Sequence, residues 1–243
     1  MIFRCIDLEC SGELPDADIV EVGWVDVIGE PYSGWIIHPY VSHLVNPGKP
    51  IDPRSSGIHH IVGTDVIKAP PAEHVLREAF TVPLESSIFV AHFADYEQQV
   101  LGGKRGFQWI DTWKLSIHLA PNAPNFKLQT LRYWLDLDVD PSQASPAHRS
   151  GPDAHVNAHL LVRMLAKLTP DEMVSISDGP VLLPKLFFGK YAKLPIAEVE
   201  TSYLEWMLRQ RNEETGELAF DKNVIHTCIT QIEQRRKNWK GKL

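Results

Sequence analysis

The sequence predicts an α/β protein, with a mixed β-sheet and flanking helices, followed by a small helical module. Three observations support this prediction. Three β-rich runs near the start of the chain are separated by glycine and proline, as expected for a meander of strands. Strand-like and helical patterns then alternate up to about residue 168, which is typical of α/β units. Beyond a turn-forming cluster at residues 177–180, the patterns are helical.

The meander begins with a strand over residues 2–9, in which alternation places Asp7 and Glu9 on the same face. Two further strands are expected over residues 19–28 and 33–44, because both runs are rich in β-branched and aromatic side chains. Since the sequence predicts no long helix between them, the three strands should pair consecutively.

After the meander, helical and strand-like patterns alternate. We expect one helix opened by Pro70 and Pro71 and a long one after Pro152, because proline is favoured in the first turn of a helix. The expected series is a helix to residue 80, a strand over 87–91, a helix over 95–101, further elements at 109–112 and 128–135, and a helix over 153–168.

These elements divide the chain into three parts. Residues 1–168 form the main domain, residues 169–181 form a linker that starts with a helix-capping pattern, and residues 182–243 form the C-terminal module. Two helices are expected in this module, over residues 196–209 and 223–237.

Composition limits the class of protein. Of 243 residues, 44% are hydrophobic and 23% are charged, values close to those of folded soluble proteins. The three cysteines lack metal-like spacing and are expected to be free thiols in a reducing compartment. With no signal peptide and no apolar run of about 18 residues, we expect a cytoplasmic protein without a membrane partner.

Charge is distributed unevenly. The net charge is −7, and residues 1–170 account for all of it, with 13 Lys and Arg against 20 Asp and Glu. Residues 231–243 carry five Lys and Arg around Trp239 with only Glu233 opposing. Two interpretations of this tail stay open: it contacts phosphates and stacks on a base, or it is a solvated helix end.

Acidic side chains and a histidine recur at intervals that could bring them together: Asp7 with Glu9, Asp95 to Glu97, and His148 with Asp153. Carboxylates packed together repel one another and raise their own pKa values unless a cation offsets the charge. The pattern therefore predicts a site for divalent metal, as used in phosphodiester hydrolysis.

Helical geometry selects among the acidic residues. Glu97 shares its helix face with Val100 and Leu101, whereas Asp95 lies about 200° away and suits the N-cap of that helix. Glu97 is thus the better metal ligand.

The same geometry applies to the long helix. Asp153 lies on the face that carries Asn157, which should meet the sheet. His155 and His159 lie on the opposite face and are expected to be solvent-exposed, with a zinc pair as the alternative.

Two segments carry a family resemblance. Residues 6–12 (IDLECSG) resemble the first motif of the DnaQ-like 3′-to-5′ exonucleases, and residues 148–154 (HRSGPDA) resemble their third. Residues 92–97 (HFADYE) take the place of the second motif, which usually reads His-Asn-x-x-Phe-Asp, so Glu97 replaces an aspartate. The resemblance covers residues 1–168 and implies an RNase H-like fold. Residues 188–191 (FGKY) and 203–206 (YLEW) resemble a small C-terminal module found in one branch of this family.

The resemblance also implies the site. Metal ligands for two Mg²⁺ or Mn²⁺ ions would be Asp7, Glu9, Glu97 and Asp153. His148 would act as general base, because an imidazole has an ordinary pKa of about 6.5. Contacts to the terminal nucleotide would come from Leu8, Ile58 and His59, although residues 57–59 could instead be an ordinary loop.

The resemblance implies a metal-dependent 3′-to-5′ exodeoxyribonuclease that releases 5′-nucleotides from DNA 3′ ends, favours single strands and acts in DNA repair. One alternative is a 3′-to-5′ exoribonuclease, since nothing in the sequence detects a 2′-hydroxyl. Another is a non-catalytic nucleic-acid-binding module with a degenerate second motif. A homodimer is compatible with the sequence. A zinc deaminase would need a Cys-x-x-Cys pair, which the sequence lacks.

Overall fold

The structure is a computed structural model that describes residues 1–212 and 215–240. The chain folds as two compact units, and each is considered by itself. The first unit comprises Met1–Leu115 and Ala123–Ser177, and the second comprises Ser116–Asn122 and Asp178–Leu243. Among the described residues, no helix is long and apolar enough to cross a lipid bilayer.

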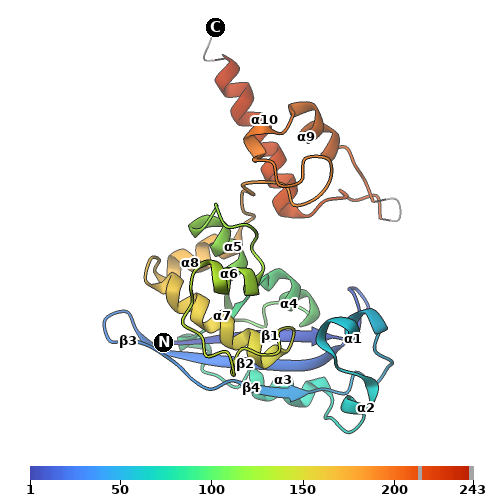
Figure 1. Cartoon of the computed structure of the whole chain (residues 1–243), viewed down its shortest axis with the longest axis vertical. Helices are drawn as coiled ribbons and strands as arrows, with labels where there is room; N and C mark the ends of the chain where they lie inside the picture. The colour runs from blue at the N-terminus through green and yellow to red at the C-terminus, as the bar shows by residue number, and fades with distance from the viewer. Residues whose placement is uncertain (213–214, 241–243) are drawn as a thin grey trace. The chain divides into compact units, whose positions relative to one another are not determined.

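A mixed sheet forms the centre of the first unit (Figure 1). Its order is β3–β2–β1–β5–β6, and β4 also pairs with β2. β1 is antiparallel to β2 and parallel to β5, and β5 is parallel to β6. The strands are β1 (Ile2–Cys10), β2 (Ile19–Glu30), β3 (Gly34–Ile37), β4 (Val41–Leu44), β5 (Ser87–Ala91) and β6 (Gln108–Asp111). The predicted combination of a meander and α/β units is confirmed.

One predicted strand differs in detail. The run expected as a single strand over residues 33–44 is two short strands, β3 and β4, which pair with different parts of β2. Residues 38–40 between them are outside the ladder. Pro39 lies in this gap and has no N–H to donate to a neighbouring strand, which accounts for the interruption.

Helices surround the sheet. The helices that begin in the first unit are α1 (Pro53–His59), α2 (Gly63–Val66), α3 (Ala72–Ala79), the 3-10 helix η1 (Leu84–Ser86), α4 (Ala94–Val100), α5 (Thr112–Leu119), α6 (Leu128–Trp134), α7 (Ser150–Leu165) and α8 (Pro170–Asp178). The sequence interpretation did not include α1. Its first turn is stabilised by Asp52, whose carboxylate accepts the N–H of Arg54 at 2.8 Å, with Pro53 as the first helical residue. The capping pattern expected before α8 is present, since Glu172 accepts the N–H of Thr169 at 2.8 Å.

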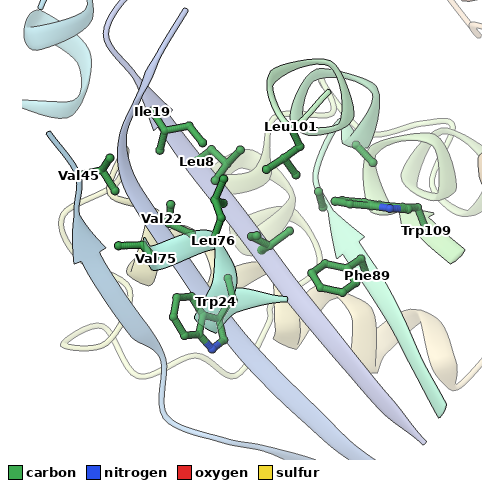
Figure 2. Packing of buried hydrophobic residues seen from close by; sticks show 14 residues of the cluster. Leu8, Ile19, Val22, Trp24, Val45, Val75, Leu76, Phe89, Leu101 and Trp109 are labelled. Atoms are coloured by element: carbon green, nitrogen blue, oxygen red, sulfur yellow. The ribbon is translucent and has the colours of Figure 1, made fainter. Parts of the chain in front are cut away.

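The two faces of the sheet have different roles. α3 packs on one face through Val75 and Leu76, which join Leu8, Val22 and Trp24 in one buried hydrophobic cluster (Figure 2). α7 covers the other face of β1 and β2 (Figure 1). Because side chains alternate along a strand, the residues between those of the α3 cluster point toward α7.

The second unit contains the 3-10 helix η2 (Ile196–Glu198), α9 (Thr201–Met207) and α10 (Lys222–Lys240). The helix expected over residues 196–209 is therefore η2 followed by α9. In the basic tail, Arg235 donates hydrogen bonds to the carbonyls of Val199, Ile196 and Ala197 at 2.8, 3.1 and 3.0 Å. This arginine holds η2 against α10, so it has a structural role. Lys242 and the side chains of Trp239 and Lys240 lie outside the described part of the tail.

Candidate active site

Three carboxylates meet where β1 runs past the first turns of α7. One oxygen each of Asp7, Glu9 and Asp153 can be chosen so that the three lie within 4.8 Å of one another. β1 supplies Asp7 and Glu9 from alternate positions on the face toward α7, as its alternation predicts. Asp153 lies in the first turn of α7 and is buried. Such a set of hard oxygen donors suits Mg²⁺ or Mn²⁺.

The electrostatics of this cluster favour a cation. Burial, and then repulsion from Glu9 and Asp153, raise the pKa of Asp7 well above its usual value. Burial and repulsion from Asp153 raise the pKa of Glu9 to about 8. Burial also raises the pKa of Asp153, although Gln129 and His148 donate hydrogen bonds that oppose the shift. Without a cation these carboxyl groups hold protons more tightly than isolated carboxyl groups do, and a bound divalent metal would displace those protons.

Glu97 lies on α4, which follows β5 at the carboxyl end of the parallel strands. Its side chain is buried, and its Oε2 has no hydrogen-bond partner within residues 1–212 and 215–240. Burial, and then the carboxylates of Asp111 and Glu9, raise its pKa well above the usual value, and Glu97 in turn raises the pKa of Asp7. A buried carboxylate oxygen left without a donor fits a site that a metal ion completes.

The expectation that Asp95 caps α4 is wrong. The N-cap position is Phe93, which has a left-handed backbone with φ of 80°, and Asp95 is the second residue of the helix. Asp95 instead forms an ion pair with Lys114 at 3.2 Å. Lys114 is only 1% exposed and also donates to the carbonyl of Ser177 at 2.7 Å. The tertiary partner of Asp95 therefore outweighs its local preference for a cap.

Asp111 ends β6 and caps the helix that follows it, α5. One of its oxygens accepts the N–H groups of Phe93, Trp113 and Lys114 at 3.2, 2.9 and 3.2 Å. Its bond to Phe93 joins the turn that leads into α4 to the start of α5. Burial raises the pKa of Asp111 to about 6. Sequence reasoning missed this residue, although a carboxylate that ends an apolar strand was a usable signal.

His148 lies on the loop before α7 and is exposed, with φ of 60°. Its backbone N–H donates to Oδ2 of Asp153 at 2.7 Å, and Gln129 donates to Oδ1 at 2.7 Å. The imidazole is thus attached to an ordered backbone beside the carboxylate cluster while the ring remains open to solvent. This arrangement allows the ring to exchange protons with a water molecule at the site.

A cavity of about 280 Å³ adjoins the cluster and is lined by Glu9 together with the three residues predicted to contact substrate, Leu8, Ile58 and His59. Ile58 is 53% exposed at the rim. His59 is buried, and its Nδ1 accepts the N–H of Ile61 at 3.0 Å, so Nε2 carries the proton and donates to the carbonyl of Cys10 at 3.2 Å. Both ring nitrogens of His59 are therefore engaged with backbone.

Two residues adjacent in sequence to predicted metal ligands meet in this cavity. Cys10 and Tyr96 both line it, and their side chains are hydrogen-bonded to each other. Burial raises the pKa of the Cys10 thiol to about 11, so the thiol stays protonated at neutral pH. The pair forms part of the cavity wall next to Glu9.

The two histidines expected on the solvent side of α7 are not exposed. His155 is buried and His159 is partly buried, with ring centroids 4.8 Å apart. The ring of His155 lies edge-on against Tyr40, with centroids 6.4 Å apart, and Tyr40 belongs to the segment between β3 and β4. Burial lowers the pKa of both rings, which keeps them neutral.

His92 of the second motif has a structural role. Burial lowers its pKa to about 4, and its ring nitrogens lie 3.0 Å from Oγ1 of Thr112 and 2.8 Å from the carbonyl oxygen of Phe126. Thr112 also donates to Oδ1 of Asn157 at 2.6 Å. These contacts connect the end of β5 to α7, on the face of that helix predicted from the position of Asp153.

The chain matches the family model described as "Exonuclease" over residues 5–161. It is 32% identical over 222 residues to Exodeoxyribonuclease 10 of Escherichia coli strain K12, which covers 89% of this chain and 95% of that protein. It is 29% identical over 210 residues to the DNA polymerase III PolC-type of Caldanaerobacter subterraneus subsp. tengcongensis, which covers 81% of this chain and 14% of that protein.

Solved structures share the fold. A structure of exonuclease X in complex with 5′-overhanging duplex DNA matches with a TM-score of 0.62 and 30% identity, over 72% of this chain and 99% of that one. The nuclease domain of 3′hExo, a DEDDh family member bound to rAMP, matches with a TM-score of 0.53 and 18% identity, over 68% of this chain and 92% of that one. The predicted fold class is confirmed.

Proposed function

The chain belongs to the exonuclease family whose model it matches, and we propose that this 3′-to-5′ exonuclease acts on DNA 3′ ends, releases 5′-nucleotides and serves in DNA repair. The observation that carries the proposal is the cluster of Asp7, Glu9 and Asp153 beside a cavity of about 280 Å³. Metal-assisted phosphodiester hydrolysis requires a cluster of carboxylates that can bind cations next to a cavity that can hold a nucleotide.

The donor set fits the proposed metals. Asp7, Glu9 and Asp153 present oxygens to one another, and the buried Oε2 of Glu97 has no donor among the residues described. These four residues would hold two Mg²⁺ or Mn²⁺ ions. When bound, the ions would offset charge that builds up on the reacting phosphate and ease deprotonation of the attacking water.

His148 acts as the general base in this proposal. It takes a proton from the water that attacks the terminal phosphorus, and the bond from phosphorus to the 3′ oxygen of the preceding nucleotide breaks. The released nucleotide keeps its 5′ phosphate, and the 3′ oxygen of the new chain end takes a proton from solvent water to become a hydroxyl. The exposed position of the imidazole lets it pass the proton on to solvent.

The cavity would receive the terminal nucleotide. Leu8 and Ile58 offer apolar surface to the base, and His59 contributes the edge of its ring to the wall, because its nitrogens already bind backbone. Single strands are favoured in this proposal because a terminal base must separate from its partner to enter such a cavity.

DNA is favoured over RNA by the relatives of higher identity. The protein from Escherichia coli carries the name Exodeoxyribonuclease 10, and the structure at 30% identity is a complex with duplex DNA. We further propose that residues 1–168 are the exonuclease domain, residues 169–181 a linker and residues 182–243 an accessory module.

End-labelled substrates test this function. Purified protein is incubated with 3′-labelled and 5′-labelled single-stranded DNA and RNA in Mg²⁺, Mn²⁺ or EDTA. The proposal predicts rapid loss of the 3′ label from DNA as a 5′-mononucleotide, gradual shortening of 5′-labelled DNA, slower attack on RNA and no reaction in EDTA. Faster degradation of RNA than of DNA would show that RNA is the substrate. Binding of nucleic acid without cleavage in either metal would contradict the proposed catalytic activity.

A further inference from the structure

Glu21 is a buried carboxylate next to the site whose chemistry differs from that of its neighbours. β2 places it directly opposite Glu9 in the antiparallel ladder, so both side chains lie on the face toward α7. Its side chain is 2% exposed. Burial would raise its pKa, yet hydrogen bonds from Arg149 and Ser150 hold that pKa below the usual value. Glu21 is therefore ionised where Glu9 tends to keep a proton.

Donors occupy both oxygens of Glu21. Arg149 donates to Oε2 from Nε at 2.8 Å and to Oε1 from Nη2 at 2.6 Å, as a two-pronged pair. The N–H of Ser150 donates to Oε2 at 3.0 Å, and the hydroxyl of Ser42 donates to Oε1 at 2.9 Å. Each oxygen thus accepts two hydrogen bonds, which leaves Glu21 unsuited to be a further metal ligand.

The segment that Glu21 holds is the one that carries the reacting groups. Residues 148–150 form the junction between the loop and α7. His148 donates its backbone N–H to Asp153 at 2.7 Å, and Asp153 donates its own N–H to the carbonyl of Arg149 at 3.0 Å. The junction is therefore fixed from the sheet by Glu21 and from the helix by Asp153.

A glycine beside Glu21 brings this junction close to the sheet. Gly23 lies two residues along β2, on the same face, and a Cβ placed there would be 2.3 Å from the carbonyl carbon of Ser150 and from the nitrogen of Gly151. The helix start therefore contacts the bare backbone of β2. The Glu21–Arg149 pair lies at the edge of this contact and orients the residue that precedes the helix.

We propose that Glu21, acting through Arg149, is a positioning residue that sets where His148 stands relative to the carboxylate cluster. This inference rests on the proposed function, in which His148 is the general base. Glu21 contacts neither substrate nor metal in this account. Its loss leaves Arg149 without its carboxylate partner and releases the junction, while Asp7 and Glu9 remain in place on β1.

A second ion pair on β2 provides a matched control. Arg4 donates to Asp26 from Nε at 2.8 Å and from Nη2 at 2.7 Å, with the same two-pronged geometry. Arg4 also donates to the carbonyl of Ala79 in α3, so this pair lies on the face away from the site. Asp26→Asn disturbs an arginine–carboxylate pair of the same strand without touching residues 148–150.

Kinetics provide the first test. Glu21→Gln replaces one of the two accepting oxygens with an amide NH₂ group, which cannot accept the hydrogen bonds of Arg149, Ser150 or Ser42. We expect kcat to fall about 10- to 100-fold with KM for DNA nearly unchanged. Adding Glu21→Gln to His148→Ala should then cost no more than about twofold, because the residue that Glu21 positions is already gone. Losses that multiply in the double variant, or a Glu21→Gln enzyme no slower than Asp26→Asn, would overturn the proposal.

Hydrogen–deuterium exchange provides a test that needs no activity. In Glu21→Gln, the amides of His148 and Ser150 should exchange about tenfold faster, as expected when roughly one hydrogen bond is lost. Asp26→Asn should leave them at the wild-type rate, and bound Mn²⁺ should not restore their protection in Glu21→Gln. Unchanged exchange in Glu21→Gln overturns the inference. A wild-type protein that fails to degrade DNA contradicts the proposed function instead, so the two failures are distinguishable.

Discussion

The backbone N–H of His148 donates a 2.7 Å hydrogen bond to Oδ2 of Asp153, five residues later. The residue proposed as general base and a proposed metal ligand are thereby joined through a single turn of chain. His148 adopts a left-handed backbone with φ of 60°, which costs conformational energy for a residue with a Cβ. The hydrogen bond to Asp153 offsets part of that cost, which gives the spacing of these two residues a structural reason.

The first prediction separates the two acidic residues of α4. Glu97→Gln should lower the rate of DNA degradation at least about 100-fold, because it removes a ligand from a metal that contributes several kcal/mol to catalysis. Asp95→Asn should keep most of the activity but destabilise the fold by about 1–3 kcal/mol, since buried Lys114 loses its ion-pair partner. Initial rates and urea unfolding of both variants check this. An Asp95→Asn protein that is slow but as stable as the wild type would instead indicate that Asp95, and not Glu97, is the metal ligand.

The second prediction concerns pH. In the folded protein the pKa of Glu9 is raised to about 8, and that of Asp7 is also raised, both first by burial. The folded state therefore binds more protons than the unfolded state above the ordinary carboxyl pKa. The stability that these two groups contribute is therefore fully present below the ordinary carboxyl pKa and is lost as the pH rises toward 8. Thermal unfolding in EDTA from pH 5 to 8 should show this loss.

The control for the pH prediction is a variant that lacks the titrating groups. Asp7→Asn combined with Glu9→Gln should flatten the dependence of the unfolding temperature on pH, and saturating Mn²⁺ should do the same in the wild type. An unfolding temperature in EDTA that rises steadily to pH 8 would contradict the electrostatic description of the cluster.

The third prediction concerns the approach of α7 to the sheet. Gly23→Ala places a Cβ 2.3 Å from backbone atoms of Ser150 and Gly151, which neither rotamer changes nor small shifts relieve. We expect a destabilisation of about 1–3 kcal/mol and a loss of activity greater than about tenfold. Gly63→Ala is the control, because nothing lies within 4 Å of a Cβ at that position. Equal behaviour of the two variants would contradict the close contact.

The fourth prediction concerns the rim of the cavity. Ile58→Ala should raise KM for single-stranded DNA about 5- to 10-fold, the equivalent of about one to two methylene groups that pack on the terminal base, with little change in kcat. Stability should change little, because Ile58 is 53% exposed. Ile36→Ala on β3, another exposed isoleucine, should leave both constants unchanged. An unaltered KM in Ile58→Ala would remove this residue from the substrate site.

Periodicity in the sequence correctly predicted which side chains share a face of a single strand or helix. Alternation along β1 placed Asp7 and Glu9 on one face, and helical geometry placed Asn157 on the inner side of α7. The helix that begins at Pro53 carried a usable signal in the Asp52–Pro53 pair, which is a favoured helix start. These features could all be read locally.

Features that depend on distant partners were missed or wrong. Asp95 pairs with Lys114 instead of capping its helix, and His155 is buried beside Tyr40 from the segment between β3 and β4. No pattern near Glu21 indicates its role, because its partner Arg149 lies 128 residues further along the chain. No local pattern encodes such contacts, since they arise only when the elements assemble.

The most direct test of the account compares His148→Gln with Glu97→Gln for both Mn²⁺ affinity, by calorimetric titration, and release of the 3′ label from single-stranded DNA. The account predicts that His148→Gln binds Mn²⁺ like the wild type but reacts at least about 100-fold more slowly, whereas Glu97→Gln loses both affinity and rate. Wild-type rates in His148→Gln, or undiminished Mn²⁺ affinity in Glu97→Gln, would contradict the division of roles between base and metal ligands.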